Sequence, residues 1–337
     1  MKKILITGLT GFVGSWLAML LYSKGYKVYG ISLSNNNPLH IYNKCKISKI
    51  SKSYLCDIKN YAGLHKIFIK IKPDFVVHLA AQPLVFTSYH KPFDTLFANV
   101  QGTLNVFALT KKYGSGKVIN FTSDKVYENS GKNIAYKESD TLKGYDPYSL
   151  SKSCSDLIGQ CLNLKHYDNH KMKISTIRSG NIIGGGDWSN YRLIPDYYSA
   201  FLKRKNLIIR QPLNIRPWQH VINPISIIHQ IINKSKLSFF DTFNIGPNNK
   251  NYNVKFVIDK LNTINRDKEV KVKYLKNTKL RESENLKLNI LKSKKKFKYP
   301  RSNINIDLIK TNEWYLNSFV KSDMSEITLQ QINDYLN

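Results

Sequence analysis

The sequence has few cysteines, few acidic residues and no long hydrophobic run. Its cysteines are Cys45, Cys56, Cys154 and Cys161, which form no Cys-x-x-Cys pair and have no His neighbour at zinc-ligand spacing. We therefore expect reduced, structural thiols and no metal site. The apolar stretches are too short or too interrupted to span a bilayer, and no small-residue cleavage site follows the apolar N-terminus. These absences predict a cytoplasmic protein that has no membrane partner.

The scarcity of acidic residues leaves a formal charge of +29, from 52 basic and 23 acidic side chains. Such an excess raises the question of nucleic acid, because clustered Lys and Arg release counterions from a phosphate backbone. Here the lysines are scattered, and the one dense run, at residues 294–298, has the pattern of a surface helix end. We expect no nucleic acid partner, since a phosphate-bearing small substrate needs only a few of these charges.

Strand and helix patterns alternate through the first half of the chain. A short buried strand at residues 3–7 is followed by a helical pattern at 12–24 and a second strand at 27–33. The alternation continues with strands near 53–57, 75–79, 117–121 and 174–178, and with helices near 60–71, near 92–113 and from 147. Such alternation requires crossovers, and therefore a parallel sheet covered on both faces. The predicted fold class is α/β, a Rossmann-type doubly wound parallel sheet.

The second half of the chain is less regular. With 337 residues, 42% of them hydrophobic, the chain can bury one large core or two modest ones. Beyond about residue 180 the elements become short and the loops aromatic-rich. We expect a cofactor domain over residues 1–180, with some return of the chain from about 220–246. A smaller mixed α/β substrate domain over 181–337 would pack against it as one unit.

A Gly-x-x-Gly-x-x-Gly loop follows the first strand and opens directly into a helix. In this position the glycines give a tight turn, let the backbone approach a pyrophosphate and allow close packing of helix on strand, while the helix N-terminus supplies partial positive charge. An ordinary tight turn is the alternative, but the strand-loop-helix context favours dinucleotide binding. The predicted cofactor-binding residues here are Gly8, Thr10, Gly11, Phe12, Val13 and Gly14.

The end of the second strand departs from the usual dinucleotide-binding pattern. It reads Gly-Ile-Ser-Leu at residues 30–33, where an Asp or Glu often binds the adenosine ribose. No Arg stands there for a 2′-phosphate, so NAD is favoured over NADP. Asp57, at the end of the third strand, is a candidate for the adenine amine, and a helix N-cap before Lys59 is an equal alternative.

Two polar segments carry the candidate chemistry. Ser123 and Asp124 follow the fifth strand, at the edge of the sheet where open parallel sheets collect their active sites. Tyr148 and Lys152 are four residues apart and so share one helix face. A lysine ammonium near a phenol stabilises the phenolate, so we expect a lowered pKa for Tyr148. Such a Tyr-x-x-x-Lys pair alone is common, and a plain surface pair is its simplest interpretation.

Together these motifs resemble the extended short-chain dehydrogenase/reductase family, and within it the CDP-glucose 4,6-dehydratases, across nearly the whole chain. Several of the matching stretches are long and irregular, which argues against coincidence. They lie at residues 7–17 (TGLTGFVGSWL), 78–85 (HLAAQPLV), 122–129 (TSDKVYEN), 144–152 (GYDPYSLSK), 178–188 (RSGNIIGGGDW), 192–196 (RLIPD) and 215–221 (IRPWQHV).

The resemblance implies a redox-neutral elimination of water from a nucleotide-linked hexose, with NAD as the cofactor. Tyr148 would accept the C4 hydroxyl proton, Ser123 would bond the same oxygen and Asp124 would be the acid for the departing C6 hydroxyl. Lys125 would be the C5 base, where related dTDP-glucose dehydratases carry Glu. The resemblance also places Ile58, Leu79, Ala80, Ala81 and Asn99 at the cofactor, together with Tyr148 and Lys152.

On the substrate side, the resemblance points to Gln82 for a sugar hydroxyl and to Asn181, Arg192 and Arg216 for the nucleotide diphosphate. Guanidinium forks suit pyrophosphate oxygens. His220 is a weaker candidate that orients a loop in the alternative interpretation, while Trp188 and Trp218 are more often core than base-stacking residues. His78, in an apolar strand, is read as a core histidine. The resemblance further implies a homodimer or tetramer through the helices near 92–113 and 147–165.

Two alternatives remain open at this stage. The first is a 4-epimerase or a dTDP- or UDP-sugar dehydratase, which would share the glycine loop, Tyr148 and Lys152; the Ser123-Asp124-Lys125 triplet argues against both. The second, suggested by the positive charge, is a non-catalytic nucleotide- or RNA-binding protein of the same fold. It predicts a broken active-site set, yet every position is filled.

Overall fold

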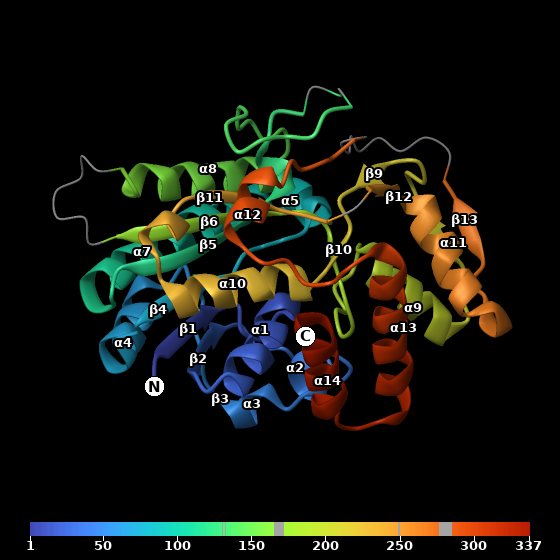
Figure 1. The fold of residues 1–337 in the computed structure, drawn as a ribbon, viewed down its shortest axis with the longest axis horizontal. Coiled ribbons are helices and arrows are strands. Elements are labelled where there is room, and N and C mark those ends of the chain that lie inside the picture. The colour runs from blue at the N-terminus through green and yellow to red at the C-terminus, as the bar shows by residue number, and fades with distance from the viewer. Residues whose placement is uncertain (130, 132, 165–171, 249, 276–284) are drawn as a thin grey trace.

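A computed structural model of the protein describes residues 1–129, 131, 133–164, 172–248, 250–275 and 285–337 (Figure 1). Seven strands form one sheet in the order β11-β6-β5-β4-β1-β2-β3, and every neighbouring pair is parallel. The strands are β1 (Lys3–Thr7), β2 (Lys27–Ser32), β3 (Ser51–Leu55), β4 (Phe75–His78), β5 (Lys117–Ser123), β6 (Lys173–Ser179) and β11 (Thr242–Ile245). The predicted doubly wound α/β fold is confirmed, with its switch of direction between β1 and β4.

Helices cover both faces of this sheet because alternate residues of each strand point to opposite sides. From β1, Ile4 and Ile6 pack with α1 (Phe12–Ser23), α10 (Ile222–Lys234) and α14 (Ser325–Leu336). Leu5 packs on the other face, with α4 (Tyr61–Ile71) and α7 (Gly102–Tyr113); α8 (Pro147–Leu162) covers the same face. The short helices α2 (Ile41–Lys44), α3 (Ile47–Ile50) and α5 (Val85–His90) fill connections.

The helix predicted near 92–113 is interrupted by a wider turn. It consists of α6 (Pro92–Leu96), a π-helical turn (Phe97–Gln101) and α7. A π-turn inserts one extra residue into the ladder of hydrogen bonds, and it turns Asn99 inward, where that side chain is 1% exposed.

A second core lies beside the carboxyl ends of the strands. It is built from α9 (Leu193–Lys203), β8 (Leu207–Ile209), α11 (Val254–Ile264), β13 (Val272–Tyr274) and α13 (Ile304–Val320). Short strands join it to the sheet: β7 (Ile182–Ile183) pairs with β10 (Gln219–His220), and β9 (Ile215–Arg216) with β12 (Tyr252–Asn253). The division of the chain near residue 180 stays a prediction, since α10, β11 and α14 all return to the first core.

The dense lysine run lies at the end of α12 (Leu291–Lys296), with Lys294, Lys295 and Lys296 exposed, so the interpretation as a surface helix end is confirmed. Within the described ranges, no helix is both long enough and apolar enough to cross a membrane.

Candidate active site

A cavity of about 380 Å³ opens at the carboxyl ends of β1, β4, β5 and β6, between the two cores. The glycine-loop helix forms one side of it, and the loops around β7 and α9 form the other. Many of the predicted site residues line this one space although they are far apart in sequence: Phe12, Val13, Leu79, Ala81, Ser123, Asp124, Lys125, Tyr148, Lys152, Asn181, Arg192 and Arg216.

The glycine loop is packed too tightly for larger residues. Gly8 has a φ of 78°, and a Cβ on it would lie 2.9 Å from the backbone nitrogen of Ala80. A Cβ on Gly14 would lie 2.2 Å from the carbonyl oxygen of Gly8. α1 starts directly after Gly11, which has no side chain to cap the first turn. The loop therefore presents backbone N–H groups at a helix N-terminus, the arrangement that binds pyrophosphate.

Thr10 ties this loop to the end of β2. Its backbone nitrogen donates to the Ser32 hydroxyl at 3.0 Å, and its hydroxyl donates to the Leu33 carbonyl at 3.0 Å. Asn35 then donates from Nδ2 to the Thr10 carbonyl at 2.9 Å. The polar groups after β2 thus shape the loop, a role for Asn35 that the sequence analysis missed because the contact depends on the turn of the chain.

Asp57 and Ile58 lie beside the loop but do not line the cavity. The Asp57 carboxylate accepts from the Lys59 backbone nitrogen at 2.9 Å, while the N-cap of α4 is Asn60, which accepts from Gly63 at 2.9 Å. The alternative interpretation of Asp57 as a helix N-cap is therefore wrong; it stabilises the preceding turn. Ile58 is buried. Its predicted contact with the cofactor, and that of Asp57 with the adenine amine, stay predictions.

Ser123 and Asp124 form the acidic corner of the cavity. The Ser123 hydroxyl donates to Asp124 Oδ1 at 3.0 Å, and both side chains are buried. Among the described residues, Asp124 Oδ2 has no hydrogen-bond partner. Burial raises the pKa of Asp124, although Lys125, Ser123 and Arg216 act in the opposite direction. Burial therefore shifts Asp124 toward its neutral, protonated form.

Tyr148 and Lys152 come from the start of α8, which the Asp146 side chain caps by accepting from Ser149 at 2.9 Å. Burial raises the pKa of Tyr148 to about 12, with a hydrogen bond from Ser123 acting against it. The expected lowering of this pKa is wrong for this geometry, because burial outweighs the groups that lower it. Lys152 Nζ donates to the Phe121 carbonyl at 2.7 Å. Burial lowers the pKa of Lys152 to about 8.

Asn99 and Gln82 shape the loop after β4. Asn99 Oδ1 accepts from the Gln82 backbone nitrogen at 2.8 Å, and Asn99 Nδ2 donates to Ser151 at 2.8 Å. The Gln82 amide donates to Leu84 and Thr95. Both side chains are thus engaged within the protein, and direct contacts from Gln82 to sugar and from Asn99 to cofactor stay predictions.

His78 is confirmed as a core histidine. It bonds Thr7 at 2.8 Å and Thr103 at 3.0 Å, and it is 1% exposed. His220 is equally buried, stacked on Tyr335 at 4.6 Å and away from the cavity lining. Its predicted substrate contact is therefore without support from this geometry, which fits the alternative that it orients a loop.

Two arginines face the cavity from the substrate side. Arg192 donates to Asp187 at 3.2 Å, and that carboxylate also accepts from the Ser189 backbone and hydroxyl. Arg216 is 5% exposed. The sequence analysis did not predict Asp187 as a site residue. The signal that could have indicated it was its position directly after three glycines and five residues before Arg192. Trp218 donates to the Tyr252 carbonyl within the second core, as expected of a core residue.

Asp196 adds a titratable group to the cavity wall. Burial raises its pKa to about 6, opposed by a backbone hydrogen bond from Tyr191 and by Arg210. The folded state therefore holds this proton more tightly than the unfolded state, and the stability that Asp196 contributes is lost as pH rises from about 4 through 6.

We predict that Asp196→Asn raises the melting temperature at pH 7.5 by about 2–4 °C. This is the shift expected when the free energy of unfolding increases by roughly 1 kcal/mol. At pH 4 the gain should vanish, because the wild-type carboxyl is then protonated. Thermal unfolding at both pH values is the measurement. Asp259→Asn, at an exposed carboxylate paired with Lys255, is the control and should show no such gain. Equal gains at both pH values would contradict the prediction.

Comparisons with known proteins agree with this geometry. The CDP-glucose 4,6-dehydratase of Salmonella typhimurium is 37% identical over 273 residues, which cover 78% of this chain and 76% of that protein. The dTDP-D-glucose 4,6-dehydratase of Dictyostelium discoideum is 29% identical, over 73% of this chain and 58% of that one.

Solved structures share the fold over nearly the whole chain. The dTDP-glucose 4,6-dehydratase of Bacillus anthracis, in complex with NAD, has a TM-score of 0.78 at 24% identity and covers 94% of this chain and 97% of its own. The UDP-glucuronic acid 4-epimerase of Bacillus cereus, in complex with UDP-glucuronic acid and NAD, has a TM-score of 0.81 at 23% identity, with 94% and 99% covered. The family model described as GDP-mannose 4,6 dehydratase matches residues 5–306. The chain therefore belongs to the GDP-mannose 4,6-dehydratase family of nucleotide-sugar enzymes.

Proposed function

We propose that the protein is an NAD-dependent dehydratase that converts CDP-D-glucose to CDP-4-dehydro-6-deoxy-D-glucose. The observation that carries this proposal is the Ser123-Asp124-Lys125 corner of the cavity, in which Ser123 and Asp124 are buried and Lys125 is half-buried. It combines a carboxyl group that burial favours in its protonated form with an adjacent lysine. An elimination of water across two carbons needs both an acid and a base, whereas a 4-epimerase needs neither at C5 or C6.

The glycine loop fits a dinucleotide, since its backbone has room for no Cβ at Gly8 or Gly14 and leads into an uncapped helix start. Phe12 and Val13 line the same end of the cavity, next to Leu79 and Ala81. NAD+, when bound, supplies a reversible hydride acceptor and a positive charge.

Tyr148 is the base for the C4 hydroxyl in this proposal, and Ser123 is its partner at the same oxygen. The Ser123 hydrogen bond lowers the pKa of Tyr148, against the effect of burial. Lys152 holds α8 against β5 through the Phe121 carbonyl, and its ammonium lies on the same helix face as the phenol. The Ser123 hydrogen bond favours the phenolate, which is the form of Tyr148 that can accept the hydroxyl proton.

Asp124 protonates the departing C6 hydroxyl, because its buried carboxyl keeps its proton more readily than an exposed one. Lys125 removes the C5 proton. Its ammonium must first lose a proton, which desolvation in a closed, substrate-filled cavity would favour.

Asn181, Arg192 and Arg216 bind the nucleotide diphosphate in this proposal. The two guanidinium groups lie on the cavity wall opposite the glycine loop, and Asp187 holds Arg192 in place. The choice of CDP rests on the 37% identical relative of that specificity and on Lys125.

The proposal includes a homodimer, or a tetramer built from it, in the cytoplasm. Large apolar side chains are exposed along the helix formed by α6, the π-helical turn and α7, and along α8. Their spacing places them on one face of each helix. They are Phe93 (73% exposed), Phe97 (59%), Leu104 (40%), Leu150 (45%) and Leu157 (50%). The second predicted dimer helix was expected to extend to residue 165, and that residue lies outside the described residues.

Turnover with CDP-, dTDP- and UDP-glucose, side by side, tests the function. We expect the base-sensitive ultraviolet absorbance of a 4-keto-6-deoxy sugar, with the highest kcat/KM for CDP-glucose. Tyr148→Phe should reduce kcat by about 10²–10⁴-fold, because the C4 proton then has no acceptor. No product from any nucleotide-glucose would contradict the dehydratase, and a 4-epimer as product would favour an epimerase.

Lys125→Met tests the C5 base. The variant should lose exchange of the C5 hydrogen with deuterated water, measured by mass spectrometry, while still oxidising C4, measured by the absorbance of reduced cofactor. Lys143→Met, at an exposed lysine paired with Glu128, is the control. Undiminished C5 exchange in Lys125→Met would remove Lys125 from this role.

Phe97→Asp tests the dimer. A charge at the centre of the apolar face should convert the assembly to monomers, measured by sedimentation or light scattering. Ile208→Asp, at a similarly exposed apolar residue on β8, is the control and should leave the mass unchanged. A wild-type protein that is already monomeric would contradict the dimer.

A further inference from the structure

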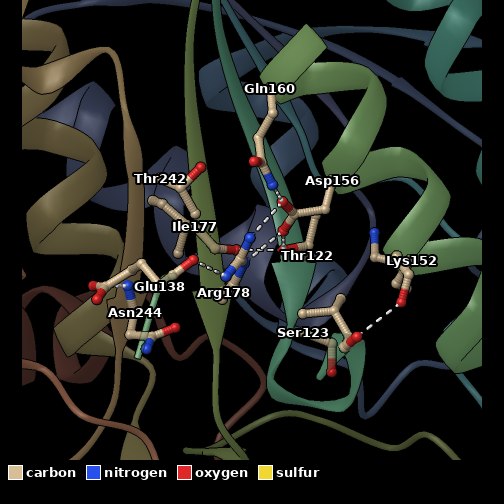
Figure 2. A network of polar contacts seen from close by, with 12 residues as sticks. Thr122, Ser123, Glu138, Lys152, Asp156, Gln160, Ile177, Arg178, Thr242 and Asn244 are labelled. Carbon is tan, nitrogen blue, oxygen red and sulfur yellow. Dashed lines mark hydrogen bonds and ion pairs between the residues drawn. The ribbon is translucent and has the colours of Figure 1, made fainter. Parts of the chain in front are cut away.

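A buried ion pair joins β6 to α8 beneath the cavity (Figure 2). Arg178 donates from Nε to Asp156 Oδ2 at 2.8 Å and from Nη2 to Asp156 Oδ1 at 2.9 Å, a bidentate contact. The two side chains are 1% and 0% exposed. Such a fork fixes the relative orientation of the two groups as well as their distance.

Both side chains have further hydrogen-bond partners. Asp156 accepts from Thr122 at 3.0 Å and from Gln160 at 2.7 Å. Arg178 Nη1 donates to the Tyr127 hydroxyl at 2.9 Å and to the Glu138 carbonyl at 3.0 Å. The network therefore connects β5, β6 and α8 with the segment that contains Tyr127 and Glu138.

The position of this pair along the chain links it to the proposed chemistry. Thr122 immediately precedes Ser123 on β5. Asp156 lies one helical turn after Lys152 and two turns after Tyr148 on α8. The Thr122–Asp156 contact thus directly connects β5, which leads to Ser123 and Asp124, with α8, which carries Tyr148.

A buried ion pair contributes little net stability compared with apolar packing of the same volume, because both charges lose their hydration. In some proteins, buried polar or charged groups serve instead to fix one arrangement of the elements that they join. A buried ion pair with several further hydrogen-bond partners, adjacent to both site segments, therefore points to a positioning role.

We propose that Asp156, held by Arg178, and Thr122 are positioning residues that fix α8 relative to the end of β5, so that Tyr148 and Lys152 meet Ser123 and Asp124. This inference rests on the proposed function for the roles of those four residues. It assigns no contact with substrate or cofactor to Arg178, Asp156 or Thr122.

The Asp156 carboxylate also acts on Lys152 through its charge. It favours the ammonium form, against the burial that lowers the pKa of Lys152. The other titratable groups around Lys152 are Tyr148 on α8 and His78 on β4, whose pKa burial and the Lys152 charge lower to about 3, so that it is neutral. The Phe121 carbonyl on β5 accepts from the ammonium.

Thr122→Val is the first test, because it removes the hydroxyl that donates to Asp156 and to the Ile177 carbonyl without changing side-chain volume greatly. We expect kcat for CDP-glucose to fall roughly ten- to a hundredfold, as for a small misplacement of reacting groups, with KM changed less than about twofold. Amide hydrogen exchange should become faster at residues 123–126 and 147–153. Thr110→Val, at an equally buried hydroxyl that bonds Val106 within α7, is the control and should change neither.

Asp156→Asn is the second test, through the pH profile of kcat. Loss of the carboxylate charge lowers the pKa of Lys152, so the alkaline limit of activity should move to lower pH by about one unit. A purely structural role would lower the melting temperature and leave this limit in place.

The proposal is overturned by wild-type kcat and wild-type exchange in Thr122→Val. It is equally overturned if Asp156→Asn folds and keeps the wild-type pH profile; if that variant does not fold, Thr122→Val decides alone. A wild-type protein that converts no nucleotide-glucose would refute the proposed function, while the exchange measurements would still decide the positioning of α8.

Discussion

The bidentate contact between Arg178 and Asp156 is the constraint on which the site geometry depends. Two strands and one helix meet at it. β5 and β6 are also joined by the hydrogen bonds of their parallel pairing, and α8 is also joined to β5 by Lys152 at the Phe121 carbonyl. Removing one partner of such a pair costs about 3–5 kcal/mol, since the other charge is left buried and unpaired. The pair therefore opposes a shift of α8 relative to the two strands.

Burial has the same effect on three groups in the cavity: it favours their neutral forms. It raises the pKa of Asp124 and of Tyr148 and lowers that of Lys152. In the proposed role of Asp124 as an acid this is useful directly, because a raised pKa makes its carboxyl group hold a proton more readily. For Tyr148 it is an obstacle, which positive charge brought by a bound cofactor would offset. The chemistry of the site thus depends on what fills the cavity.

The last helix, α14, also packs against the core that contains the glycine-loop helix α1. It packs directly on α1 (Figure 1). Tyr335 of α14 stacks on His220 of β10, which lies just before α10. Trp16 of α1 donates to the carbonyl of Gly185 at 3.0 Å, and Trp314 leaves no room for a Cβ on that glycine. These contacts connect the glycine-loop helix to the turn that leads to Asp187 and Arg192, so the two cavity walls are held to each other.

The sequence by itself determined the α/β class, the glycine loop and the segments that carry Ser123, Asp124, Tyr148 and Lys152. These follow from local periodicity and from short motifs, because a parallel sheet must bring the ends of its strands to one edge. The core role of His78 and the surface position of the lysine run were equally local.

Only the tertiary structure decided how those groups are tuned and held. The raised pKa of Tyr148 follows from its burial, to which the charges of Asp124 and Asp146 add. The engagement of Gln82 by its own loop and the pairing of Asp187 with Arg192 depend on turns that bring their partners within reach. The Arg178–Asp156 pair joins residues 22 positions apart on different elements, and no spacing rule predicts it. Side-chain environment arises from packing among distant segments, and the sequence pattern does not encode it locally.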